Sequence, residues 1–193
     1  MASVRPITQL GHPILRTPAA RVEVPIPAAI RELADDMLAT LRAANGVGIA
    51  APQVGESQSL FVVASRPNPR YPDAPEMEPT VMVNPEIVAR SADLVAGWEG
   101  CLSIPGLRGL VPRARTIRVR YQTLDGEAVD REFADFVARV IQHEDDHLRG
   151  VVFLDRLASP RDVVTEREYL DRYASAPTPL ADSGLMIPAS RPA

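Results

Sequence analysis

The amino-acid sequence predicts an α+β fold built from antiparallel β-sheets. The chain of 193 residues has the length of one domain, and its 46% hydrophobic and 24% charged residues are typical of a globular protein. Its strand signals come before a late helix, and a hairpin turn joins two of them. That order favours antiparallel sheets over a doubly wound parallel sheet. We therefore expect one domain over residues 1–173.

Three segments are predicted to be helices. Residues 27–43 begin with proline, place apolar side chains at helical spacing, and are followed by an Asn-Gly pair that would end the helix. A second helix is expected over residues 135–148, with Asp135 as its N-cap and Gly150 just beyond its end. A third helix is expected over residues 163–173.

The strand signals lie between the first two helices. Residues 59–64 and 80–88 are rich in β-branched and apolar residues, and Pro85 is expected to interrupt the second run because proline has no N–H. Residues 115–124 alternate apolar and polar side chains and lead into an Asp-Gly turn at 125–126. This alternation and turn predict a β-hairpin.

Two segments are too rich in proline for regular structure. Residues 66–79 contain the run PNPRYPDAP and are expected to form an exposed surface loop. Residues 174–193 are rich in proline and alanine and show no periodicity, so we expect a mobile C-terminal tail.

Charge and cysteine content argue against several classes of protein. The chain carries 21 basic and 25 acidic residues, a formal net charge of −4, which does not favour a nucleic-acid partner. Its single cysteine, Cys101, rules out an internal disulfide and suits a reducing compartment or a chemical role for the sulfur. The sequence contains neither an apolar run of about 18 residues nor a recognisable secretory signal. We expect a cytoplasmic protein with no membrane partner.

The strongest local motif is His143-Glu144-Asp145-Asp146-His147. Two histidines four residues apart on a helix are about 40° apart around its axis and about 6 Å apart along it, so both can reach one divalent cation. The glutamate between them can move a proton of bound water. Phe136 and Val140 continue the same face, which predicts that the motif is buried. The polar residues expected to lie away from that face are Asp135, Arg139, Gln142, Asp146 and Arg149.

A catalytic metal usually takes three protein ligands, so a further ligand is needed. Cys101 is one candidate because a cation would stabilise its thiolate, although a lone cysteine is often only a buried small side chain. His12 is another histidine, but its position before Pro13 is more typical of a loop or strand start. From these residues, Cys101 is the better candidate.

Three motifs together resemble a known family. GVGIAAPQ at 46–53, EGCLS at 99–103 and QHEDDHLRG at 142–150 occur in the order of the signature motifs of peptide deformylase. The resemblance covers roughly residues 7–157. It implies antiparallel β-sheets packed around a central helix that carries HExxH. It also implies a metal-dependent hydrolase of N-terminal processing, which removes the N-formyl group from the N-terminal methionine of new polypeptides and releases formate.

The resemblance also implies roles for individual residues. Cys101, His143 and His147 would hold the metal, Glu144 would be the general acid/base, and the Gln53 side chain and Leu102 backbone N–H would form the oxyanion hole. Arg113 and Asp146 are candidates to orient these ligands, with a surface role for Asp146 left open. The cofactor would be one divalent ion, Fe²⁺ natively, with Zn²⁺, Ni²⁺ or Co²⁺ able to replace it. The partners would be N-formylmethionyl peptides, as nascent chains at the ribosome.

Five further residues are candidates for substrate binding. Val47, Phe136 and Val140 are expected to form an apolar pocket for the methionine side chain, because they flank the motif residues. Gly48 and Gly100 are expected to let an extended peptide pair with the protein backbone, although simple turn geometry would also explain both glycines.

Two alternative functions are compatible with the HExxH motif. An HExxH endopeptidase would take its third ligand from Glu166 or Glu168, and its metal would not need Cys101. A metal-stabilised binding module would keep its function without Glu144.

Overall fold

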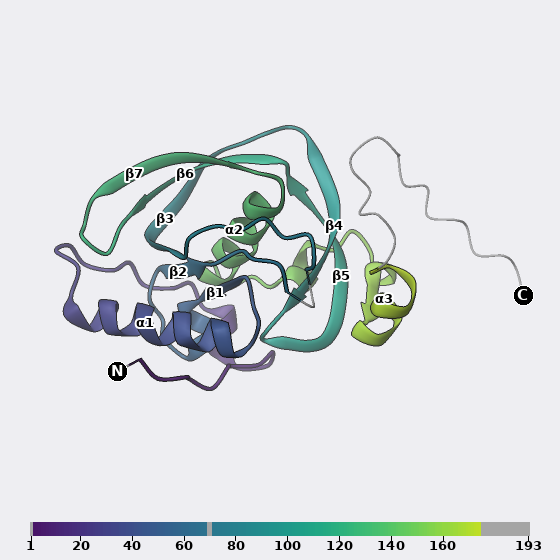
Figure 1. Ribbon diagram of the computed structural model, residues 1–193, viewed down its shortest axis with the longest axis horizontal. Coiled ribbons are helices and arrows are strands. Elements are labelled where there is room, and N and C mark those ends of the chain that lie inside the picture. Colours follow the sequence, from purple (N-terminus) through teal and green to yellow (C-terminus); the bar gives the residue numbers. More distant parts are fainter. Residues whose placement is uncertain (1, 69–70, 175–193) are drawn as a thin grey trace, which may run out of the picture.

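Two antiparallel sheets form the framework of the structure, a computed structural model that describes residues 2–68 and 71–174 (Figure 1). The larger sheet has the strand order β1-β2-β3-β6-β7 and the smaller one β4-β5-β8. Every pairing in them is antiparallel, which confirms the predicted fold class. The strands are β1 (Gly48–Ala50), β2 (Leu60–Val63), β3 (Thr80–Arg90), β4 (Leu94–Cys101), β5 (Ile104–Ala114), β6 (Thr116–Gln122), β7 (Ala128–Ala134) and β8 (Val163–Thr165).

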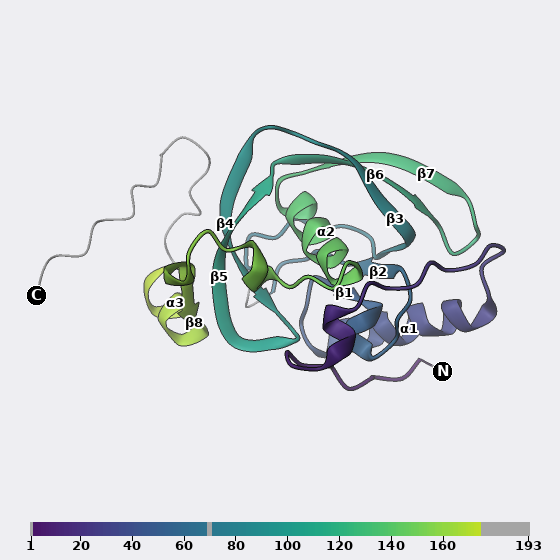
Figure 2. The same cartoon turned by 180° about the vertical axis from the view of Figure 1, so that it is seen from behind.

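Three α-helices accompany the sheets: α1 (Ala28–Ala43), α2 (Asp135–Leu148) and α3 (Glu166–Arg172). Helix α2 lies inside the fold, enclosed by strands of both sheets, whereas α1 lies along the outside of β1 and β2 (Figures 1 and 2). Short 3₁₀ helices occur at Pro13–Arg16, Ala51–Val54, Phe153–Arg156 and Pro160–Asp162. Because strands cover α2 on several sides, ten of its 14 residues are buried.

The boundaries of the first two helices follow the sequence closely except at the start of α2. Helix α1 matches the predicted segment, with Pro27 as its N-cap. Helix α2 also covers the predicted residues, but Ala134 is its N-cap and Asp135 is its first residue. The prediction of Asp135 as the cap was wrong because its carboxylate lies 3.7 Å from Nη1 of Arg115 and makes no capping hydrogen bond.

Strand β3 continues through Pro85, which corrects the predicted interruption. Its register with β6 shifts between Val83 and Glu86, so the proline lies in a bulge where no ladder N–H is needed. The preceding Asn84 has a φ of 49°, and its side chain exchanges two hydrogen bonds of 2.8 and 2.9 Å with the backbone of Val22. The bulge is therefore fixed by a polar clamp.

The predicted third helix is shorter than expected. Residues Val163–Thr165 form β8, which pairs with β5, and α3 begins only at Glu166. The described residues of the 66–79 loop contain an isolated bridge between Asn68 and Tyr71 but no helix or longer strand. Apart from Ala174, the predicted tail lies outside the described residues.

The long hairpin of β4 and β5 is absent from the sequence prediction. Its strands contain several glycines and prolines, which obscure the alternation that marks a strand. This hairpin carries Cys101 at the end of β4 and places it beside α2. Within the described residues, none of the helices is long and apolar enough to cross a bilayer.

Replacement of Gly150 by alanine is expected to destabilise the fold. Gly150 has a φ of +71°, and an added Cβ would lie 2.7 Å from the backbone C and O of Arg16. We expect Gly150→Ala to lower the free energy of unfolding by about 2 kcal/mol or more, measured by urea denaturation. Gly126→Ala is the control, because Gly126 has a φ of +84° with open space around it and should lose only about 1 kcal/mol. An equal loss of unfolding free energy in the two variants would contradict the close approach of Gly150 to the Arg16 backbone.

Candidate metal centre and active site

Three potential metal ligands converge where the β4–β5 hairpin meets α2. One donor atom each from Cys101, His143 and His147 lies within 4.8 Å of the other two, and all three residues are buried. Cys101 Sγ is 3.2 Å from Nε2 of His147. His12 is exposed and accepts a hydrogen bond from the N–H of Ile14, well apart from this group. The structure therefore brings Cys101, and not His12, to the histidine pair.

The chemistry of this cluster fits a divalent cation. Burial opposes ionisation of the Cys101 thiol, but the adjacent imidazoles of His147 and His143 outweigh it and hold the pKa of the thiol well below its usual range. A thiolate with two imidazoles is a donor set that suits zinc and neighbouring transition metals. Oε2 of Glu144 and Nδ1 of His147 are buried without a hydrogen-bond partner among the described residues.

Glu99 orients the His143 ring through its Nδ1 atom. Its Oε2 lies 3.0 Å from Nδ1 of His143, and Arg113 donates to both of its oxygens at 2.9 Å. Burial favours the neutral acid, but the charge and hydrogen bonds of Arg113 outweigh it, so the pKa of Glu99 lies well below its usual value. An ionised Glu99 can only accept, which places the proton of His143 on Nδ1 and leaves Nε2 free to bind a cation.

The middle of the polar side of α2 is covered, which corrects the expectation that it lies away from the core, whereas the two ends, Asp135 and Arg149, are exposed as expected. Asp146 is 4% exposed and accepts a 2.6 Å hydrogen bond from Arg113, so these two residues form the predicted supporting pair. Gln142 is also buried, and its amide bonds both backbone groups of Ala114. Arg139 reaches the β4–β5 hairpin. The prediction failed because a second sheet, not solvent, covers this side of the helix.

Gln53 and Glu144 both lie next to the cluster. Gln53 is 1% exposed, and its Oε1 accepts from the Ala50 N–H at 2.8 Å, which turns its amide nitrogen to within 3.5 Å of Cys101 Sγ. Burial raises the pKa of Glu144 to about 7. A Cβ on Gly48 would lie 2.4 Å from Oε1 of Glu144, so glycine at this position gives the carboxylate its room.

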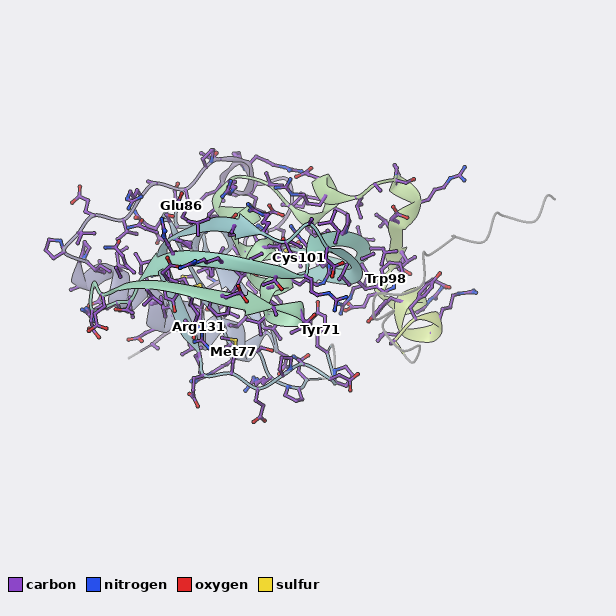
Figure 3. The ribbon with its side chains drawn as sticks, turned by 90° about the horizontal axis from the view of Figure 1, so that it is seen from above. Tyr71, Met77, Glu86, Trp98, Cys101 and Arg131 are labelled. Carbon is purple, nitrogen blue, oxygen red and sulfur yellow. The ribbon has the colours of Figure 1, made fainter. Side chains whose placement is uncertain are left out.

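A pocket opens beside the cluster and contains all five predicted substrate-binding residues. Its lining also includes Tyr71, Trp98 and Arg139, which sequence reasoning did not assign to a site. Trp98 stands next to the EGCLS motif, but Tyr71 comes from the proline-rich loop and carried no sequence signal. Figure 3 shows Tyr71, Trp98 and Cys101 toward the same end of the molecule. The predicted residues in the lining are Val47, Gly48, Gln53, Gly100, Cys101, Leu102, Phe136, Val140, His143 and Glu144.

A protein-family model described as polypeptide deformylase matches residues 4–163. The chain belongs to the polypeptide deformylase family. Peptide deformylase 2 of Nostoc sp. is 58% identical over 164 residues, which cover 85% of this chain and 92% of the relative. Peptide deformylase 2 of Shewanella oneidensis is 48% identical over 84% of this chain and 90% of its own length.

Solved deformylase structures share this fold. The class I type b peptide deformylase from Acinetobacter baumannii, bound to Met-Ala-Ser, is 51% identical with a TM-score of 0.79, covering 81% of this chain and all of that one. Peptide deformylase from Thermotoga maritima is 35% identical with a TM-score of 0.72, covering 81% and 99%. The predicted hydrolase activity on N-formylated polypeptides is thus confirmed at the level of the family.

The comparisons favour a deformylase over the HExxH endopeptidase. Both glutamates proposed as its third ligand belong to α3, where Glu166 pairs with Arg108 and Glu168 with Arg172. Neither belongs to the group of donor atoms around the histidine pair.

Replacement of Glu99 by glutamine is expected to weaken metal binding by this deformylase. The neutral amide accepts more weakly from Nδ1–H of His143 and leaves the neighbouring arginines without their shared anion. We expect the dissociation constant for Zn²⁺, measured by competition with a chromophoric chelator, to rise about 10- to 100-fold. Glu56→Gln is the control, because Glu56 is exposed and pairs with Arg5 away from the cluster. Equal affinity in the two variants would show that Glu99 does not orient the ligand.

Proposed function

We propose that this deformylase holds one divalent cation with Cys101, His143 and His147, and that Glu144 transfers the proton during hydrolysis. The single observation that carries the proposal is the convergence of the three buried donors beside a pocket that Glu144 also lines. When bound, the cation supplies Lewis acidity, which lowers the pKa of water and polarises a carbonyl group. The proposed native ion is Fe²⁺, as the sequence resemblance implies, and the same donors also suit Zn²⁺, Ni²⁺ and Co²⁺.

Glu144 carries the proton in the proposed mechanism. Its carboxylate takes a proton from the water whose oxygen attacks the formyl carbon. When the bond between the formyl carbon and nitrogen breaks, Glu144 gives this proton to the leaving amine, so formate and a free N-terminal methionine result. A carboxyl group with a pKa near 7 is suited to both transfers at neutral pH.

Gln53 and Leu102 stabilise the negative charge that develops on the formyl oxygen. We assign the donors to the side-chain amide of Gln53 and the backbone N–H of Leu102. The Gln53 amide is fixed in advance by its bond to Ala50, so it needs no reorientation during the reaction. Each donor of this kind typically contributes about 3 kcal/mol to transition-state stabilisation.

The substrate occupies the pocket as an extended peptide. The apolar side chains of Val47, Phe136 and Val140 take the methionine side chain. Strand β1 is the edge strand of the larger sheet, so we assign peptide pairing to its outer edge next to Gly48 and Gly100, beside the Ala50 N–H that bonds Gln53. We further propose that residues 1–173 act as one catalytic domain. Its substrates are nascent chains met at the ribosome in the cytoplasm.

Formate release from formyl-Met-Ala-Ser tests the proposed function. The full chain is prepared without oxygen, loaded with Fe²⁺, and assayed for formate and for free Met-Ala-Ser. We expect the two products in equal amounts. No formate from protein that carries one metal ion per chain would overturn the proposal.

Glu144→Gln is expected to separate metal binding from catalysis. Glutamine keeps the size of the side chain but cannot carry the proton, so kcat should fall about 100- to 10,000-fold. The metal content, measured by atomic absorption, should stay that of the parent protein. Glu56→Gln should keep the parental kcat. A Glu144→Gln enzyme with near-parental kcat would exclude Glu144 as the proton carrier.

A further inference from the structure

Arg139 extends from α2 to the β4–β5 hairpin, and its guanidinium is tightly held there. Nη2 donates to the carbonyl of Val95 at 2.6 Å, and Nη1 donates to that of Val111 at 2.8 Å. Nη1 also lies 2.9 Å from Oε1 of Glu99 and 3.3 Å from the carbonyl of Gly97. Three backbone carbonyls of β4 and β5 and the carboxylate of Glu99 thus hold the Arg139 side chain in place.

Gly97 leaves the space that the guanidinium occupies. A Cβ on Gly97 would lie 2.8 Å from both Cζ and Nη2 of Arg139. The flat guanidinium therefore lies directly on the bare backbone of β4. The Arg139 side chain is only 13% exposed, yet it belongs to the lining of the substrate pocket. It is a rigid and charged part of the lining that also contains the apolar Phe136 and Val140.

Arg139 lies one turn of α2 before the candidate metal ligand His143. Arg139 and Val140 precede His143 and Glu144 by four residues, which is one turn, or about 6 Å along the helix axis. The Glu99 carboxylate also joins the two side chains, because its Oε2 lies 3.0 Å from Nδ1 of His143 and its Oε1 lies 2.9 Å from Nη1 of Arg139. Arg139 and His143 line the same pocket, so the guanidinium can limit the space open to the first side chain.

We propose that Arg139 determines specificity by limiting the length of the first side chain that the pocket accepts. The inference rests on the proposed function and deepens it. A side chain one methylene longer than methionine has to displace a guanidinium held by four hydrogen bonds. An apolar side chain at position 139 would move aside by changing its rotamer, whereas Arg139 cannot move without losing its hydrogen bonds to Glu99 and three carbonyls.

Peptide binding to Arg139→Ala tests this proposal. The peptides are Met-Ala-Ser and ethionyl-Ala-Ser, whose first side chain is one methylene longer. Trp98 is the only tryptophan of the chain and lines the pocket, so its fluorescence reports binding without any turnover. The ratio of the two dissociation constants measures discrimination, and kcat/KM for the formylated peptides is measured alongside.

The parent protein should prefer the methionine peptide by about 10-fold or more, since one methylene at a fixed wall has an effect of this size. Arg139→Ala should reduce that preference to less than about threefold. Arg149→Ala is the matched control on the same helix, because Arg149 pairs with Asp145 outside the pocket and should keep the parental ratio. An unchanged ratio in Arg139→Ala, or an equal loss of affinity for both peptides, would overturn the proposal.

Arg139→Lys covers the case in which the alanine variant does not fold. Lysine keeps the charge but lacks the planar fork that bonds several carbonyls at once, so its end can move aside. The preference should fall at least about threefold, and a parental ratio would contradict the inference. A parent protein that releases no formate would refute the proposed function. Normal formate release with unchanged discrimination in the variants would refute only the role of Arg139.

Discussion

A buried ion network joins the two structural units that share the site. Glu99 on β4 bonds Arg113 on β5, and Arg113 in turn bonds Asp146 on α2. Buried charges are costly unless they are paired and hydrogen-bonded, so each of these groups depends on the others. The network holds the hairpin that carries Cys101 against the helix that carries both histidines. The metal cluster exists only while these two units keep their relative position.

The hairpin contributes more than its cysteine. The pairing of β4 with β5 shifts register between Glu99 and Cys101, which is the position of a bulge. Bulges change the direction of side chains near functional sites. The residues before and after Gly100 are both buried next to α2. Glu99 contacts Nδ1 of His143, and Cys101 contacts Nε2 of His147. Gly100 itself lines the pocket, so one short segment carries a proposed metal ligand, the carboxylate that supports His143 and part of the proposed substrate pocket.

The sequence predicted the candidate metal ligands better than the pocket residues and the strands around them. Spacing on a helix is enough to bring His143 and His147 together, because the helix alone determines their separation. Cys101 could be chosen as their partner by its chemistry and by the resemblance, but its approach could not be derived, since it depends on a hairpin that glycines and prolines obscure. Arg139 and Tyr71 could not be predicted as pocket residues. Their positions depend on the second sheet and on a long loop, which local periodicity does not reveal.

Errors in the predicted elements have a similar cause. Pro85 was expected to break β3, but the side chain of Asn84 bonds Val22 and stabilises a bulge that tolerates proline. Asp135 was expected to cap α2, but Arg115 on the neighbouring chain segment attracts its carboxylate. In both cases a contact with a residue distant in sequence overrides a local preference.

The burial of Cys101 has a consequence for its sensitivity to oxidants. The residue is 2% exposed, and among the described residues it lines the pocket proposed for the substrate. A peroxide molecule that reaches the sulfur through this pocket shares the path of the proposed peptide. On the proposed function, a bound peptide then shields the thiolate from sulfenic acid formation, and the enzyme is chemically most vulnerable when it is idle.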